Sequence, residues 1–281
     1  MIWRARTIEF VFPRPALVMG VVNVTPDSFS DGGRFLAVEA AVAHALKLVA
    51  EGAELLDIGG ESTRPGAEPV GEEEELRRVM PVIERLAGKT AAAISIDTMK
   101  PGVARAALAA GASIVNHVSA YLEDEAMWRV VAEFQAGYVC MHSQGSPQTM
   151  QKNPVYAEVV GEVGEFFSAT LKKMSAQGVA PEQVALDPGI GFGKTTEHNL
   201  RLLAGLQTFT ALGRPVMLGV SRKSFLEKIS GGSVNERLPA SLACATLAIA
   251  DGVQIIRTHD VLETVRAVRM AEAVRSRKQH V

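Results

Sequence analysis

Residues 17–33 read LVMGVVNVTPDSFSDGG, a short apolar run that ends at Asn23 and opens into a loop rich in Pro, Ser, Asp and Gly. This order is typical of a buried strand that feeds a polar loop. The pattern recurs seven more times along the chain, each time with a polar or ionisable residue at or just past the end of the apolar run. The recurrence predicts one parallel barrel whose strand ends share a polar mouth.

Helical stretches separate these apolar runs. The expected strands cover 17–22, 54–59, 91–97, 113–118, 137–142, 184–189, 215–221 and 253–260. The expected helices cover 36–51, a stretch that begins at Glu72, 101–110, 124–135, 156–177, 197–212, an Ala-rich stretch that ends at Ala250, and 261–277. Eight alternations without a linker predict an α/β fold of the (β/α)8 TIM barrel type, with residues 1–281 as a single domain.

The composition fits one barrel and gives no electrostatic sign of a nucleic-acid or membrane partner. The chain has 281 residues, and this fold usually takes about 250. Its 29 basic and 31 acidic residues leave a net charge of -2, so an anion must be bound locally. Cys140 and Cys244 lie in apolar runs, which favours buried thiols over a disulfide. With no apparent signal peptide, we expect a cytoplasmic protein.

Active sites of such barrels lie at the carboxyl ends of the strands. The residues expected to meet there are Asn23, Asp57, Asp97, Asn116, His142, Asp187, Ser221, Lys223, Arg257 and His259. Any one of them could merely cap a strand, but that explanation is weaker for the whole set. Asp97, Asn116 and Asp187 offer acceptors for a flat, donor-rich heterocycle. Arg257 and His259 offer donors for a phosphate, so the set predicts a heterocycle that carries a phosphate or diphosphate.

Two other kinds of site fit the sequence less well. The strand-end set has no cysteine and no HExxH spacing, which argues against a structural zinc site. The segment PGIGFGKTT (188–196) nearly matches the phosphate-binding GxxxxGK[ST] motif, but Pro188 stands where the first glycine is required. We therefore expect a barrel loop here, not a nucleotide-hydrolysing P-loop.

Seven segments together resemble dihydropteroate synthase, the folate-biosynthesis family that joins a pterin diphosphate to 4-aminobenzoate. They are MGVVNVTPDSFSDGG (19–33), DIGGESTRPGA (57–67), ISIDTMKP (94–101), MHSQGSPQTMQ (141–151), LDPGIGFGK (186–194), SRKSF (221–225) and RTHDV (257–261). They fall at seven of the eight strand ends, in order, which is far more specific than any single motif. The resemblance implies a transferase that condenses 6-hydroxymethyl-7,8-dihydropterin diphosphate with 4-aminobenzoate and releases diphosphate.

The resemblance also implies roles for individual residues. The pterin pocket would consist of Asp97, Asn116, Asp187 and Lys223, with Asp57 and Met141 nearby. The diphosphate would meet Asn23, Arg257 and His259, with Mg²⁺ held through Asn23 and the phosphate oxygens. The aminobenzoate, or a sulfonamide inhibitor, would lie against Thr63, Arg64, Pro65, Phe192, Lys223 and Ser224, with Ser221 and Arg222 beside them. Asp97, Asp187, Lys223 and Arg257 would carry the chemistry, and the family's homodimers imply a homodimer here.

The expected chemistry needs few specialised groups. An arylamine is neutral near pH 7 and can attack without a base. What must be stabilised is a departing diphosphate and a cation-like methylene carbon on the dihydropterin. Cationic side chains and magnesium would serve the first need, and buried carboxylates that polarise the ring would serve the second. We therefore expect dissociative substitution at the carbon that bears the diphosphate.

Two alternative functions and one departure from the family pattern stay open at this point. A pterin-binding methyltransferase barrel would share the heterocycle pocket but would not need Arg257 and His259 as a diphosphate site. A non-catalytic pterin-binding protein would not need the full polar set. The family usually has an aspartate after the pterin-binding asparagine, where this chain has His117. Alternation along the strand turns His117 toward the helix layer, as a core residue.

Overall fold

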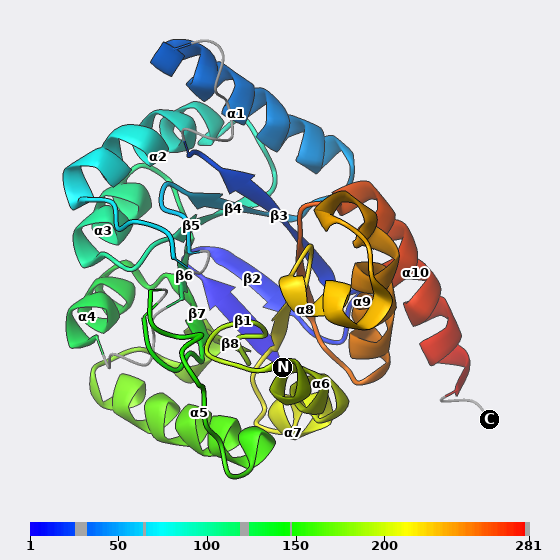
Figure 1. Ribbon diagram of the computed structural model, residues 1–281. Coiled ribbons are helices and arrows are strands. Elements are labelled where there is room, and N and C mark those ends of the chain that lie inside the picture. Colours follow the sequence, from blue (N-terminus) through cyan, green and yellow to red (C-terminus); the bar gives the residue numbers. More distant parts are fainter. Residues whose placement is uncertain (26–32, 64–65, 119–123, 147, 279–281) are drawn as a thin grey trace.

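The computed structural model describes residues 1–25, 33–63, 66–118, 124–146 and 148–278. Eight parallel strands form a barrel wall inside a ring of helices (Figure 1). These strands are β3 (Leu17–Asn23), β4 (Leu55–Gly59), β5 (Ala93–Asp97), β6 (Ile114–His117), β7 (Gly137–Met141), β8 (Val184–Asp187), β9 (Met217–Gly219) and β10 (Ile255–Thr258), and a separate hairpin contains β1 (Ile2–Ala5) and β2 (Ile8–Val11). An isolated bridge between Leu186 and Val216 links β8 to β9. The predicted (β/α)8 fold is confirmed.

Helices follow the strands in the predicted order. They are α1 (Gly33–Ala50), α2 (Glu72–Leu86), α3 (Pro101–Ala109), α4 (Glu125–Phe134), α5 (Val159–Ala176), α6 (Thr196–Ala204), α7 (Leu206–Thr210), α8 (Ser224–Ser230), α9 (Leu238–Ala250) and α10 (Val261–Lys278), with short 3-10 turns at Pro181–Gln183 and Val234–Glu236. The prediction of a single helix over 197–212 was wrong, because Gly205, a poor helix former, separates α6 from α7. Among the helices that the structure describes, none combines the length and apolar character needed to span a membrane.

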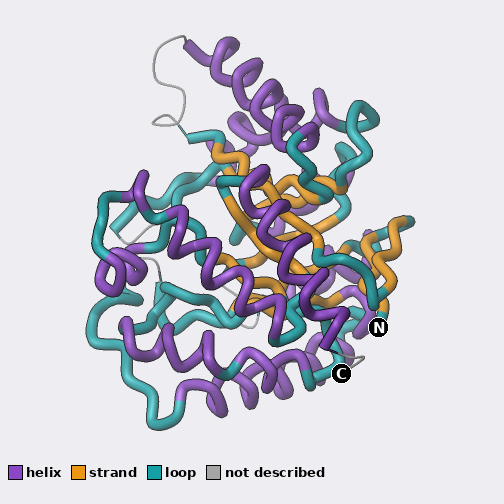
Figure 2. Tube along the Cα trace, turned by 90° about the vertical axis from the view of Figure 1, so that its right-hand side faces the viewer, coloured by secondary structure: helices purple, strands orange, loops and turns teal. Residues whose placement is uncertain are grey.

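The N-terminal hairpin, which the sequence reading missed, covers the end of the barrel where the strands begin (Figure 2). Trp3 and Phe10 pack in one buried cluster with Leu17 and Leu55, which lie at the starts of their strands. The Trp3 indole Nε1 also donates to the carbonyl oxygen of Gln183 at 2.9 Å. The hairpin therefore closes the amino end, and the opposite end is left for the site.

Alternation along the strands separates the barrel interior from the helix layer. The inner cluster contains the strand residues Leu17, Met19, Leu55, Ala93, Ile114, Val139, Ala185, Met217 and Ile255. Residues such as Val18, Leu56 and Val115 face outward and pack with the helices. Positions two or four residues beyond the inner cluster therefore point into the mouth of the barrel. These positions include Asp57, Ser95, Asp97, Asn116, Met141, Asp187 and Arg257.

Candidate active site

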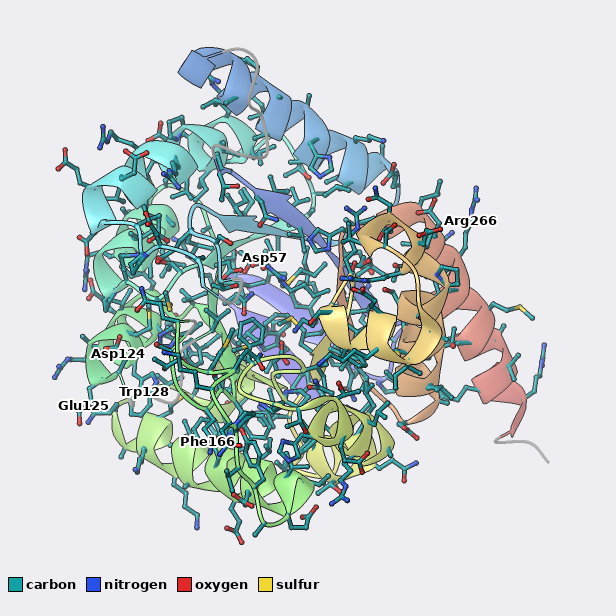
Figure 3. All side chains as sticks on the ribbon, viewed as in Figure 1. Asp57, Asp124, Glu125, Trp128, Phe166 and Arg266 are labelled. Carbon is teal, nitrogen blue, oxygen red and sulfur yellow. The ribbon has the colours of Figure 1, made fainter. Side chains whose placement is uncertain are left out.

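Asp57 is the centre of the polar group at the barrel mouth, and Figure 3 shows it inside the ring of helices. It lies on β4 and is fully buried. Its Oδ1 accepts a hydrogen bond from Ser95 Oγ at 2.7 Å, and its Oδ2 accepts from Asn116 Nδ2 at 2.9 Å and from Arg257 Nε at 2.6 Å. These partners come from β5, β6 and β10, so one carboxylate joins four strands.

Arg257 is shared between two buried carboxylates. Besides its bond to Asp57, its Nη2 donates to Asp97 Oδ2 at 2.8 Å. Burial opposes the charge of Arg257, but Asp57 and Asp97 raise the pKa of its guanidinium above the ordinary value. Burial, together with the charge of Asp57, raises the pKa of Asp97 to about 7, although Arg257 acts in the opposite direction. Asp97 can therefore change protonation state near neutral pH.

Asn116 and Asp187 present further acceptors beside this cluster. Among the described residues, no group donates a hydrogen bond to Asn116 Oδ1, although the atom is buried. A buried acceptor without a donor costs free energy, which a ligand N–H can recover. Asp187 Oδ1 accepts from the Gly189 N–H at 2.7 Å. Burial raises the pKa of Asp187, and N–H donors from a ligand would stabilise its charged form. Both residues therefore suit a ligand rich in donors.

Lys223 brings a cation to the same mouth. It caps α8, and its Nζ donates to the carbonyl oxygen of Ile190 and lies 4.5 Å from the centre of the Phe192 ring. Burial lowers the pKa of Lys223 to about 8, while Asp187 acts in the opposite direction. Gly191 has φ +83°, and a Cβ there would lie 3.1 Å from Lys223 Cδ. Glycine at this position therefore lets the lysine pass close to the loop.

The predicted residues after β9 and β10 contact one another. His259 Nδ1 lies 3.0 Å from Ser221 Oγ, and the same hydroxyl accepts the His259 backbone N–H at 3.2 Å. Arg222 pairs with Asp260, with 2.5 Å between Nη2 and Oδ1. Arg222 and His259 are therefore brought to the same side of the mouth by their own side-chain partners.

The remaining predicted residues lie around this group. Met141 ends β7, faces inward and is buried, while Asn23 ends β3 and is partly exposed. Ser224 is exposed at the start of α8, and Thr63 is partly exposed in the loop after β4. Arg64 and Pro65 lie outside the described residues.

His142 does not join the group at the mouth, contrary to expectation. It follows the inward-facing Met141, so alternation turns it outward. Its ring packs edge-on against Phe166, with 4.9 Å between ring centres, and its Nδ1 lies 3.0 Å from Lys194 Nζ. Burial lowers the pKa of His142 to about 3 and that of Lys194 to about 7. Lys194 also donates to the Phe192 carbonyl at 2.9 Å, so its ammonium faces protein acceptors inside a barrel loop.

His117 is a core residue, as alternation predicted. It is fully buried on the outer face of β6, and its Nδ1 lies 2.7 Å from the Tyr138 hydroxyl. Burial lowers the pKa of His117 to about 4, so the ring is neutral at physiological pH. The departure from the family pattern therefore leaves the inner face of β6, and Asn116, unchanged.

Two contributors were missed or undervalued from the sequence. Ser95 was absent from the predicted set, although it lies two residues before Asp97 and therefore on the same face of β5. Asp57 was expected among the converging strand ends and, by the resemblance, near the pterin pocket, whereas it is the residue that holds the cluster together. A separate hollow of about 400 Å³ lies beside Met1, Phe12 and Gln254, and none of the described strand-end residues lines it.

Known proteins share this sequence and architecture. The sequence pattern of the family described as pterin binding enzyme matches residues 19–259. The dihydropteroate synthase of Escherichia coli strain K12 is 46% identical over 263 residues, which cover 94% of this chain and 93% of that protein. The dihydropteroate synthase of Synechocystis sp. is 44% identical over 266 residues, which cover 94% of this chain and 92% of that protein.

Solved structures agree with these relatives. The Yersinia pestis dihydropteroate synthase with a sulfonamide drug complex superposes with a TM-score of 0.91 at 42% identity, covering 98% of this chain and 100% of that one. The Xanthomonas albilineans dihydropteroate synthase with 4-aminobenzoic acid gives 0.90 at 46% identity, covering 97% of both chains. Its complex with 7,8-dihydropteroate gives 0.87 at 43% identity, covering 98% of both. The chain therefore belongs to the pterin binding enzymes and, among them, to the dihydropteroate synthases.

Proposed function

We propose that the chain condenses 6-hydroxymethyl-7,8-dihydropterin diphosphate with 4-aminobenzoate, forming 7,8-dihydropteroate and diphosphate. The observation that carries this proposal is a set of buried acceptors beside two cations. Asn116 Oδ1, Asp97 and Asp187 offer acceptors to a donor-rich ring. Arg257 and Lys223 supply positive charge beside them. The ligands named for the Xanthomonas albilineans structures are the matching substrate and product.

Binding of the pterin would change the partners of Arg257. In the structure, Arg257 occupies one oxygen of Asp97. When N–H donors of the ring take that oxygen, Nη2 of Arg257 loses its partner, while Nε keeps its bond to Asp57. The guanidinium would then turn its free edge toward the diphosphate, where bidentate contacts to phosphate oxygens are favourable. His259 would supply a second donor at the same side of the mouth.

The substitution would proceed with little covalent help from the protein. The bond between the methylene carbon and the diphosphate oxygen breaks first, and the amine nitrogen of 4-aminobenzoate then forms the new bond to that carbon and releases a proton. Asp97 and Asp187 would polarise the ring and stabilise the cation-like carbon. Arg257 and Lys223 would stabilise negative charge on the departing group and the bound anions. A well-aimed donor of this kind can supply about 3 kcal/mol.

We also propose that Asn23 helps to hold Mg²⁺ on the diphosphate. Its amide oxygen is a hard ligand of the type that Mg²⁺ prefers, and it lies at the carboxyl end of β3. The described part of the chain holds no group of three or more His, Cys, Asp or Glu side chains that could bind a metal by itself. A site with one protein ligand and phosphate oxygens suits Mg²⁺, which keeps several of its waters and binds substrate phosphates. When bound, the ion would neutralise charge on the diphosphate.

The aminobenzoate would lie between the loop after β4 and the loop after β8. Thr63 belongs to the first loop and Phe192 to the second, with Lys223 and the exposed Ser224 beside them. The Phe192 ring offers a flat apolar surface to the aniline, and Lys223 and Ser224 offer donors to its carboxylate. Sulfonamides imitate both features, so we propose that they compete for this position.

We propose that the protein is a cytoplasmic homodimer. Helices α9 and α10 pack side by side at the rim of the barrel (Figure 1). Leu247, Met270 and Val274 on these helices are 67%, 66% and 48% exposed. Exposed apolar side chains on two adjacent helices are a candidate partner surface. Cys140 and Cys244 are both free thiols, as suits a reducing compartment.

One experiment tests the reaction and separates the alternatives. The purified chain is incubated with the dihydropterin diphosphate and 4-aminobenzoate, with and without Mg²⁺, and both products are measured. We expect 7,8-dihydropteroate and diphosphate in equal amounts, and only with Mg²⁺. Pterin binding without either product would favour a non-catalytic pterin-binding protein. Methyl transfer from a reduced folate to a corrinoid, with no pteroate formed, would favour the methyltransferase.

A further inference from the structure

Three charged side chains meet beside the barrel mouth but outside the pterin cluster. Glu61 lies in the loop after β4, Glu75 in the first turn of α2, and Lys100 just before α3. The Lys100 ammonium donates to Glu75 Oε2 at 2.6 Å and to Glu61 Oε2. The Glu75 and Glu61 side chains are 0% and 8% exposed. One cation from the loop after β5 therefore pairs with two buried carboxylates, one from the loop after β4 and one from α2.

Glu61 also joins the two ends of its own loop. Its Oε1 accepts the backbone N–H of Val70 at 3.1 Å, nine residues later in the chain. Arg78 Nη1 holds the start of the loop through the Gly60 carbonyl at 2.9 Å. A Cβ at Gly60 would lie 2.8 Å from a Val79 methyl, so the loop starts tightly against α2. The Glu61 side chain therefore links the start of the loop to its end, and Lys100 holds the Glu61 carboxylate in place.

The balance of charge makes Lys100 necessary to this arrangement. Burial opposes its charge, but Glu61 and Glu75 raise the pKa of Lys100 above the ordinary value. No hydrogen bond from the described residues reaches Glu75 Oε1, so Glu75 depends on Lys100. Without the ammonium, two buried carboxylates would face each other without a counter-ion, which opposes their burial in the present arrangement. Glu61, on a loop, is freer to move than Glu75 on a helix.

We propose that Lys100 is a positioning residue that fixes residues 60–63 and 66–71 of the loop after β4 and thereby sets the affinity for 4-aminobenzoate. It acts through Glu61: in the described structure the Lys100 ammonium donates to Glu61 and Glu75, and the charges of these two carboxylates reach Asp97 only at longer range, where they raise its pKa. The inference rests on the proposed function, in which Thr63 of this loop contacts 4-aminobenzoate. Because the pterin acceptors lie on β5, β6 and β8, loosening the loop should affect the two substrates unequally.

Steady-state kinetics of Lys100→Met and Lys100→Arg test this difference. For Lys100→Met, we expect the KM for 4-aminobenzoate to rise at least about tenfold, the change that loss of one charged hydrogen bond can produce. The KM for the pterin diphosphate should rise by a smaller factor, because Glu61 and Glu75 act on Asp97 only through their charge. Lys100→Arg should restore most of the loss because it keeps the charge. Lys47→Met is the matched control, since Lys47 is 71% exposed and pairs only with Glu51 in the described structure. Equal changes in both KM values, or no change in either, would overturn the proposal.

Hydrogen exchange measures the loop without any substrate. The amide of Val70 should exchange at least about tenfold faster in Lys100→Met than in the parent chain, while amides in α5 should not change. If Lys100→Met does not fold, Glu61→Gln replaces it, because glutamine keeps an acceptor for Val70 but removes the charge that Lys100 holds. Unchanged exchange at Val70 in the folded variant would refute the positioning role. If the parent chain and the Lys47→Met variant are both inactive, the proposed function is refuted. The exchange result would still decide the role of Lys100.

Discussion

Replacing Asp97 by asparagine should stabilise the fold at alkaline pH while it damages the site. Asp97 is buried 2.8 Å from Arg257 and near the charge of Asp57, and its pKa is raised from 3.8 to about 7. An unfolded chain ionises this carboxyl near pH 4, but the folded protein resists ionisation until about pH 7. The folded state therefore loses stability as the pH rises from about 4 to about 7.

The size of this loss follows from the two pKa values. They differ by about 3, and each pKa unit corresponds to about 1.4 kcal/mol, so ionised Asp97 costs the folded state up to about 4 kcal/mol at pH 8. Asparagine cannot ionise and has nearly the same shape. Asp97→Asn should therefore gain up to about 4 kcal/mol in the free energy of unfolding at pH 8. The gain should shrink by about 1.4 kcal/mol for each pH unit below 7.

Urea unfolding of both proteins at pH 5, 6, 7 and 8 measures this difference, and titrations shared by the two proteins cancel in the comparison. Asp251→Asn is the matched control, because Asp251 lies after α9 and its side chain accepts from Gln207 at 3.0 Å away from the mouth. It should change stability by no more than about 0.5 kcal/mol at any pH. Calorimetry should show pterin affinity at least about tenfold weaker in Asp97→Asn, from loss of a charged hydrogen bond. A stability difference that does not vary with pH would refute the raised pKa, and unchanged pterin affinity would remove Asp97 from the site.

Three further predictions concern the diphosphate, the core histidine and inhibition. Arg257→Ala should weaken binding of the pterin diphosphate at least about tenfold more than binding of the pterin alcohol, because a charged phosphate contact is lost; equal losses in calorimetry would make Arg257 a general pterin contact. His117→Asn should lower the free energy of unfolding by about 1 to 3 kcal/mol, because the contact with Tyr138 is lost. Both KM values should stay unchanged. An altered KM at unchanged stability would mean that His117 reaches the site. Sulfonamides should compete with 4-aminobenzoate. They should bind at least about tenfold more tightly when pterin, diphosphate and Mg²⁺ are present, because bound diphosphate and the loop after β4 complete the pocket. Equal affinity for the ligand-free protein would contradict this order of binding.

The sequence alone determined the barrel and most of its mouth. Eight apolar runs, each followed by a helical stretch, can be recognised locally, and parallel order places the carboxyl ends of all strands on one side. The period of two along a strand then puts Asp97, Asn116 and Asp187 on the inner face and His117 on the outer face. Both outcomes hold in the structure. The same rule places Ser95 on the inner face and His142 on the outer face, so alternation along a strand decides the site more reliably than position at the strand end.

Only the tertiary structure decided which of these side chains touch. Arg257 bonds to Asp57 across 200 residues of chain, and Lys194 meets His142 across 52. Neither pairing has a local signal, because each depends on how neighbouring strands are staggered and on how far a long side chain reaches within one rotamer. The closure of the barrel by the hairpin through Trp3 likewise needed the folded chain. Periodicity assigns a residue to a face, whereas the contacts and charges that give Asp57 and Lys100 their roles arise only when separate strands and loops are packed together.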